Sequence, residues 1–172
     1  MAVEESVDKV NDEVAVGEDL GFQRRWWRFE RATWVFFGLL LAADLAGAFG
    51  RGPLADATLK SGDGTLDVSY ERIERSGTPS MIKIQLGAAA LHAGIATLYV
   101  SQSVVDALGA ERIIPQPSST TIGHGGLTYR FAATAPPATV EISLRPGSPG
   151  LFGFALEVPG YDSLRARVAV VP

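Results

Sequence analysis

The segment ATWVFFGLLLAADLAGAFG (residues 32–50) is apolar apart from Asp44 and separates a short polar head from a long patterned tail. An α-helix rises about 1.5 Å per residue, so about 20 apolar residues bridge the roughly 30 Å hydrocarbon core of a lipid bilayer. The segment is just long enough to do this. We therefore predict that residues 32–50 form a transmembrane helix surrounded by the lipid bilayer.

Basic and aromatic side chains gather on the N-terminal flank of this segment. Lys and Arg beside a span hold their side in the cytoplasm, and Trp favours the headgroup layer. The flank therefore predicts a protein of the cytoplasmic (inner) membrane, with its N-terminus in the cytoplasm and its C-terminal domain outside. The residues predicted to anchor the helix and set its topology are Arg24, Arg25, Trp26, Trp27, Arg28, Arg31 and Trp34.

A cleavable signal peptide is the competing interpretation, because residues 46–48 (AGA) match the small-x-small pattern of a cleavage site. The head over residues 1–31 is long for such a signal, and its aromatic flank suits a retained anchor. An uncleaved anchor is therefore favoured, and the released form is kept as the alternative.

Asp44 is the one ionisable residue in the apolar segment. A carboxylate at the centre of a bilayer costs at least about 2.5 to 3.5 kcal/mol on insertion scales, so such residues usually have a polar partner. We predict an intramembrane contact between Asp44 and a partner helix. The alternative is a carboxylate that reaches interfacial water.

Composition limits the rest of the 172-residue chain. It has no cysteine, which excludes disulfides, thiolate metal sites and thiol nucleophiles. The formal charge of -4 comes from the acidic tail and the apolar segment, because residues 51–172 hold ten acids and ten bases. A neutral domain of this kind argues against nucleic-acid binding. We assign residues 1–31 to a cytoplasmic acidic tail with a basic and aromatic juxtamembrane segment, and residues 51–64 to a Gly- and Pro-containing tether.

From residue 66 onwards, apolar side chains alternate with polar ones, which is the period of a half-buried β-strand. Turn sequences such as Gly125-Gly126 and Pro159-Gly160 separate the runs, and in the last run Arg165 and Arg167 point away from the core. The pattern predicts an all-β immunoglobulin-like sandwich of about seven strands over residues 65–172. The runs lie at residues 66–70, 82–86, 96–100, 127–131, 140–144, 152–158 and 164–170.

One stretch interrupts the alternation. Ser103 is a possible N-cap with Asp106 three residues later, and Gly109 can end a helix, so residues 103–108 are predicted to form a short crossover helix. The following RIIPQP (residues 112–117) is extended, and its prolines favour the edge of a sheet.

The arrangement of RRWWRFER (residues 24–31), the apolar segment and a strand-rich tail containing VVDALGAERIIPQP (residues 104–117) resembles uncharacterised bacterial single-span membrane proteins with an extracytoplasmic immunoglobulin-like domain. This resemblance covers most of the chain. It implies an architecture and no activity.

No residue pattern points to chemistry. The two histidines, His92 and His124, are far apart in sequence, and zinc hydrolase and serine hydrolase motifs are missing. His124 precedes Gly125-Gly126, which favours a hairpin turn over a phosphate loop. The acidic residues Asp63, Asp67, Glu71 and Glu74 are interpreted as a solvated strand face. We therefore predict no enzyme, no catalytic or metal-binding residues and no cofactor.

Together these features predict a membrane-anchored extracytoplasmic binding or adaptor module, an accessory subunit with a protein partner in a membrane or cell-envelope assembly. The second hypothesis is a secreted or periplasmic binding domain released from a cleaved precursor. The third is a hydrolase whose site has no recognisable motif.

Overall fold

The computed structural model describes residues 20–48 and 52–172. The chain divides into two units, Met1–Ala42 and Ala43–Pro172, and each is considered by itself. Parts of three predicted segments lie outside the described residues. They are most of the acidic tail (residues 1–19), the end of the span (residues 49 and 50) and the first residue of the tether (residue 51).

The first described element is the helix α1, Leu20–Ala46, which is 27 residues long. It begins well before the predicted segment and therefore includes Arg24–Arg31. It ends at Ala46 because Gly47 adopts φ +93°, a left-handed conformation that only glycine enters at little cost. The N–H groups of Gly47 and Ala48 donate to the carbonyls of Asp44 and Ala43, both at 2.9 Å, which is a Schellman cap.

This helix corrects the predicted membrane topology. In the described part of the chain, no helix combines the length and the apolar character needed to cross a membrane. The cap at Gly47 leaves only residues 32–46 as apolar helix, about 22 Å at ~1.5 Å per residue against the roughly 30 Å that a span requires. A longer span would have to extend towards the N-terminus and would then include the charged residues Arg31, Glu30 and Arg28. The prediction of an inner-membrane protein with a transmembrane helix over residues 32–50 is therefore wrong.

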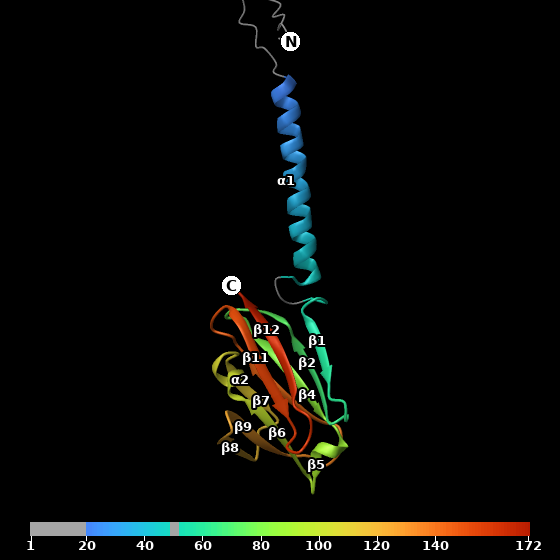
Figure 1. Ribbon diagram of the computed structural model, residues 1–172, viewed down its shortest axis with the longest axis vertical. Helices are drawn as coiled ribbons and strands as arrows, with labels where there is room; N and C mark the ends of the chain where they lie inside the picture. Colours follow the sequence, from blue (N-terminus) through green and yellow to red (C-terminus); the bar gives the residue numbers. More distant parts are fainter. Residues whose placement is uncertain (1–19, 49–51) are drawn as a thin grey trace, which may run out of the picture. The chain divides into compact units, whose positions relative to one another are not determined.

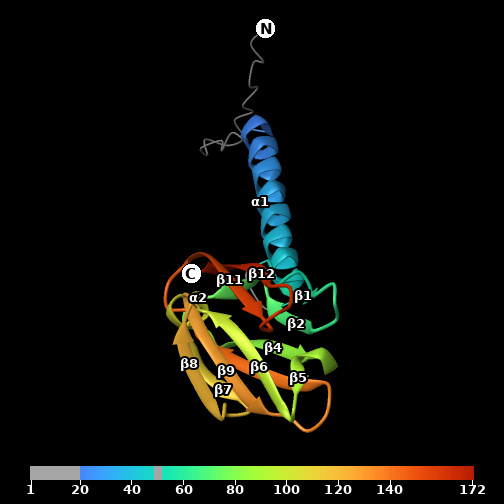
Figure 2. The same ribbon diagram turned by 60° about the horizontal axis from the view of Figure 1, so that its bottom comes forward.

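The second unit contains two β-sheets, which form two layers (Figures 1 and 2). Sheet A has five strands in the order β1 (Asp56–Lys60), β2 (Leu66–Glu71), β4 (Ser80–Leu86), β10 (Ala138–Leu144) and β7 (Ala110–Ile114). Sheet B has seven strands. Six follow the order β3 (Ile73–Arg75), β12 (Leu164–Val171), β11 (Gly150–Glu157), β6 (Ile95–Ser101), β9 (Gly126–Ala132) and β8 (Ser119–Gly123), and β5 (Leu91–His92) pairs with β6.

All seven predicted strands are present, so the prediction of an all-β sandwich is confirmed. Of the twelve strands in the two sheets, those that the sequence pattern missed are short, such as the three-residue β3, or carry no buried face, such as β8. Apolar and polar residues alternate in the sequence only where a strand has one face in the core and one in solvent, so strands of this kind show no such alternation.

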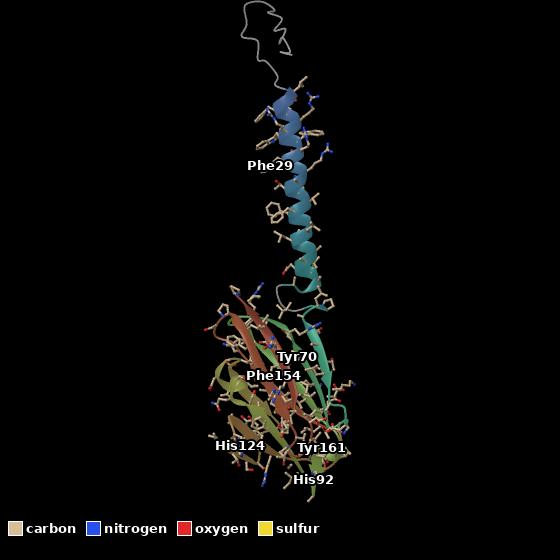
Figure 3. The ribbon with its side chains drawn as sticks, in the orientation of Figure 1. Phe29, Tyr70, His92, His124, Phe154 and Tyr161 are labelled. Atoms are coloured by element: carbon tan, nitrogen blue, oxygen red, sulfur yellow. The ribbon has the colours of Figure 1, made fainter. Side chains whose placement is uncertain are left out.

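The inward faces of both sheets form one core. Ile84, Ile142 and Leu156 are among its completely buried side chains, and burying a side chain of this size contributes roughly 1.5 to 3 kcal/mol. Tyr70 of β2 and Phe154 of β11 join the layers through an edge-to-face contact with ring centroids 5.4 Å apart (Figure 3).

The crossover between β6 and β7 is the predicted short helix. It runs over Gln102–Asp106 as α2, one residue earlier than predicted at its start, and Val104 is buried against the core. Ser101, rather than Ser103, occupies the N-cap position. A short 3-10 helix, η1 (Ala88–Ala90), precedes β5. Strand β7 ends sheet A, so the predicted edge position of residues 112–114 is confirmed.

Candidate functional site

Helix α1 carries the residues that the sequence analysis selected as a membrane anchor. The helix contains no buried residue, and Trp34, for example, is 70% exposed. The large apolar side chains that it exposes are Leu20, Phe22, Trp26, Trp27, Phe29, Trp34, Val35, Phe36, Phe37, Leu39, Leu40, Leu41 and Leu45. We refer to them as the α1 surface.

Arginine and tryptophan side chains interact along this helix. The guanidinium of Arg31 lies 5.0 Å from the centre of the Trp27 ring, which is within the range of a cation–π contact. The Nε groups of Arg24 and Arg28 donate to the carbonyls of Leu20 and Arg24, at 3.2 and 3.4 Å. These contacts hold the arginine stems along the helix while their charged ends remain exposed.

Aromatic rings also stack on α1. The centroids of Phe22 and Trp26 are 6.3 Å apart, and those of Trp26 and Phe29 are 5.9 Å apart. Arg25 is exposed and takes part in none of these ring contacts. The selected residues from Arg24 to Trp34 therefore occupy adjacent turns of a single helix.

Asp44 is not part of that group. It lies near the C-terminal end of α1, its side chain is exposed, and its carbonyl accepts the Gly47 N–H of the helix cap. Among the described residues, no cation pairs with its carboxylate. The predicted intramembrane contact of Asp44 assumed a span, so it is not retained.

The outer face of sheet B contains a groove of ≈ 590 Å³ that the sequence analysis did not select. Arg165 and Arg167 of β12 line one side, Gly153 and Ala155 of β11 form the floor, and two serines line the other side. The sequence placed the two arginines outside the core. It could not place the groove, because the groove depends on which residues of β11 lie opposite the arginines.

Glu74 is the only charged side chain that is buried in the described part of the chain, with 1% exposure. Neither of its carboxylate oxygens accepts a hydrogen bond from a described residue. Burial raises the pKa of Glu74 to about 7; the nearby Ser80 hydroxyl opposes this rise and the carboxylate of Glu71 adds to it. The interpretation of Glu74 as part of a solvated acidic face is therefore wrong.

The other acidic residues of that cluster have local partners. Asp63 Oδ1 accepts hydrogen bonds from the Ser61 hydroxyl at 2.5 Å and from the hydroxyl and N–H of Thr65 at 2.6 and 3.0 Å. These bonds, the Ser61 bond first, lower the pKa of Asp63 to about 2. Asp67 pairs with Lys60 at 2.7 Å on the surface of sheet A. Both arrangements organise the β1–β2 hairpin.

The histidines lie in two separate hairpins. His92 is exposed on β5, whereas His124 occupies the two-residue turn between β8 and β9 with φ +54°, followed by Gly125 at φ +75°. This is the predicted hairpin, displaced by one residue from the Gly125-Gly126 pair. In the described residues, no group of three or more His, Cys, Asp or Glu side chains is placed to hold a metal ion.

No protein-family model and no curated protein matches this chain. Among solved structures, the sulfur carrier protein SoxY from Chlorobium limicola f thiosulfatophilum matches with 12% identity and a TM-score of 0.37, covering 77% of this chain and 96% of that chain. Domains 4 and 5 of the S-layer protein SbsC match with 10% identity and a TM-score of 0.35, covering 68% of this chain and 54% of that chain. BslA, a bacterial hydrophobin, matches with 14% identity and a TM-score of 0.34, covering 67% and 96%. These matches assign neither a family nor a function.

Proposed function

We propose that this chain is a non-catalytic binding or adaptor module and an accessory subunit of a protein assembly, which binds a protein partner through the α1 surface. The observation that carries the proposal is that α1 exposes its large apolar side chains and buries none. Its sandwich, with mostly antiparallel strands and no disulfide, is proposed to be of the immunoglobulin-like kind.

The exposed apolar side chains of α1 favour binding to another surface that removes them from water. Most helices in proteins derive their stability from packing of an apolar face, because intrinsic helix propensity alone is marginal in water. Each Trp or Phe can bury about 150 to 250 Å² of surface, and fully burying a side chain such as Phe is worth roughly 1.5 to 3 kcal/mol. A partner with an apolar groove or an apolar helix face would supply that cover.

The composition of the α1 surface and its neighbouring arginines also suits a protein interface. Trp and Arg are the side chains that most often dominate binding energy at such interfaces. Trp27 and Arg31 are already held against each other at 5.0 Å, which limits the side-chain entropy that either would lose on binding. Within the described residues, no specific feature favours the hydrolase hypothesis over this function.

Photocrosslinking in the native host tests the proposal. A photoreactive amino acid at Trp34 should capture one defined partner, and the same residue at Thr128 on the sandwich is the matched control. The purified partner should then bind the full chain at least about tenfold more weakly when Leu39 and Leu41 are replaced with Asp, because each change places a charge in an apolar contact. Equal binding of this variant, or equal capture from Thr128, would exclude α1 as the docking surface.

A further inference from the structure

The groove on the outer face of sheet B is formed by four elements. Strand β12 contributes Arg165 and Arg167, β11 contributes Gly153 and Ala155, and the end of β6 and start of α2 contribute Ser101 and Ser103. The alternation of the strands explains why these side chains meet. Phe154, Leu156 and Val168 point into the core, so their neighbours along β11 and β12 point outward.

The register makes the arginines face small residues. Arg165 lies opposite Ala155, and Arg167 lies opposite Gly153. Neither small residue can contribute a countercharge. A Cβ atom on Gly153 would find its nearest neighbour, the Ala166 carbonyl oxygen, at 3.8 Å, so the floor of the groove is open at this point.

In the described part of the chain, neither arginine has an internal countercharge. Arg165 and Arg167 are exposed, and no carboxylate in the described residues lies within ion-pair distance of either. On sheet A, by contrast, two lysines have carboxylate partners. Lys60 and Lys83 lie directly opposite Asp67 and Glu141 on neighbouring strands and pair with them at 2.7 and 3.6 Å.

The opposite side of the groove offers a hydrogen-bond donor. Ser101 Oγ accepts the N–H of Ala155 at 2.9 Å and lies 2.9 Å from Ser103 Oγ. One of the two hydroxyl hydrogens bridges the serines, and the other is not used by any described residue. This hydrogen can be donated to an acceptor in the groove, so cationic and hydroxyl groups converge on it from two sides.

The spacing of the arginines favours one class of ligand. They are two residues apart on one strand, so they repeat at about 6.6 Å, which is also the repeat of alternate side chains in an extended peptide. The guanidinium fork matches the two oxygens of a carboxylate, and such charge-assisted contacts are the stronger hydrogen bonds in proteins. We propose that this groove binds an extended acidic peptide segment of a partner protein, with carboxylates on alternate residues facing Arg165 and Arg167.

Fluorescence anisotropy with two labelled peptides tests this inference on the full chain. A ten-residue peptide of alternating Glu and Thr should bind saturably at low salt, and the same peptide with Gln in place of Glu should bind at least about tenfold more weakly because it cannot pair with the arginines. Binding of the acidic peptide should weaken as salt is raised. Absence of saturable binding, or equal binding of the Gln peptide, would overturn the proposal.

Three variants locate the site. Replacing Arg165 and Arg167 together with Gln should weaken binding of the acidic peptide at least about tenfold, and Gly153→Glu should do the same by placing a carboxylate opposite Arg167. Arg130→Gln is the matched control, because Arg130 is an exposed arginine of the same sheet outside the groove. Circular dichroism should show unchanged β-structure in all three. Equal weakening by Arg130→Gln would show nonspecific attraction to positive charge and contradict the inference.

Two further measurements distinguish a peptide site in the groove from a small-anion site and from binding through α1. Inorganic phosphate at the same concentration of charge should fail to displace the peptide, and full displacement would assign the groove to small anions instead. The variant with Leu39 and Leu41 changed to Asp should bind the acidic peptide normally, since the groove does not include α1. The proposal for the groove can therefore be refuted while the proposal for the α1 surface stands, and the reverse.

Discussion

Sheet A pairs several of its basic side chains with carboxylates, whereas the arginines of the groove on sheet B have no such partner among the described residues. On sheet A, Lys60–Asp67 and Lys83–Glu141 pair across neighbouring strands, and Arg145, directly after β10, pairs with Glu111 of β7. On sheet B, Arg165 and Arg167 face Ala155 and Gly153. Cross-strand pairs of opposite charge are the ordinary way for a sheet to compensate surface charge. Sheet A thus pairs these three basic side chains internally, although Arg112 of β7 has no ion pair among the described residues, whereas sheet B leaves Arg165 and Arg167 without a carboxylate partner.

Both faces cover the same core, and changes to that core should have the largest effect. Ile142→Ala on sheet A and Phe154→Ala on sheet B should each lower the free energy of unfolding by about 2 to 5 kcal/mol, because both side chains are buried and truncation leaves a cavity. Urea unfolding of the full chain measures this, with Thr121→Ala, an exposed residue of β8, as a surface control. A loss below about 1 kcal/mol for Phe154→Ala would show that sheet B does not share the core.

A second effect should come from Glu74 at the edge of sheet B. The pKa of this carboxyl is raised to about 7 in the folded protein from an ordinary value of 4.5. Between pH 4.5 and about 7 the folded state therefore keeps a proton that the unfolded chain has released, so the contribution of Glu74 to the free energy of unfolding is fully present below pH 4.5 and is lost as pH rises through about 7. The loss should be about 3 kcal/mol, at ~1.4 kcal/mol per pKa unit.

Chemical unfolding of the wild type and of Glu74→Gln between pH 4.5 and 8 isolates this contribution. The difference between the two proteins should change with pH in the stated direction, since other titrating groups are common to both. A wild type that gains stability relative to Glu74→Gln as pH rises would reverse the sign and contradict the burial of this carboxylate.

Charged residues on the two faces should differ by a smaller amount in their contribution to the free energy of unfolding. A double-mutant cycle on Lys83 and Glu141, with Met and Gln as replacements, should give a coupling of about 0.2 to 1 kcal/mol that shrinks as salt is added, because the pair is half exposed. Arg165→Gln should change stability by less than about 0.5 kcal/mol, since no partner is lost. An equal loss from Arg165→Gln would reveal an internal partner and remove the contrast between the sheets.

The sequence predicted the parts of this molecule that depend on one-sided burial. The seven alternating strands and the outward direction of Arg165 and Arg167 follow from a period of two, and the β8–β9 hairpin follows from residues that tolerate positive φ. Glu74 was missed because a three-residue strand has no measurable period. The groove was missed because it requires the register between β11 and β12, which only the folded chain supplies.

The membrane prediction failed for a different reason. Hydropathy alone treats residues 32–50 as one unit, but the positive φ of Gly47 ends the helix inside that segment. Glycine is common within apolar segments, so the amino-acid pattern does not reveal which glycine acts as a cap. The same helix continues towards its N-terminus through Arg24 and Arg31, because arginine is a good helix former.

A last variant would give sheet B the charge pattern of the Lys83–Glu141 pair on sheet A. Ala155→Glu places a carboxylate directly opposite Arg165, as Glu141 lies opposite Lys83. Such a pair should raise the free energy of unfolding by about 0.2 to 1 kcal/mol relative to Ala155→Gln, which has the same shape without the charge. The gain should vanish when Arg165 is Gln, and the new carboxylate should compete with the acidic peptide for the arginine. Thermal unfolding at low and high salt measures the first effect, and anisotropy measures the second. If Ala155→Glu neither stabilises the protein nor weakens binding of the acidic peptide, Arg165 is directed away from the groove and the contrast between the two faces has another origin.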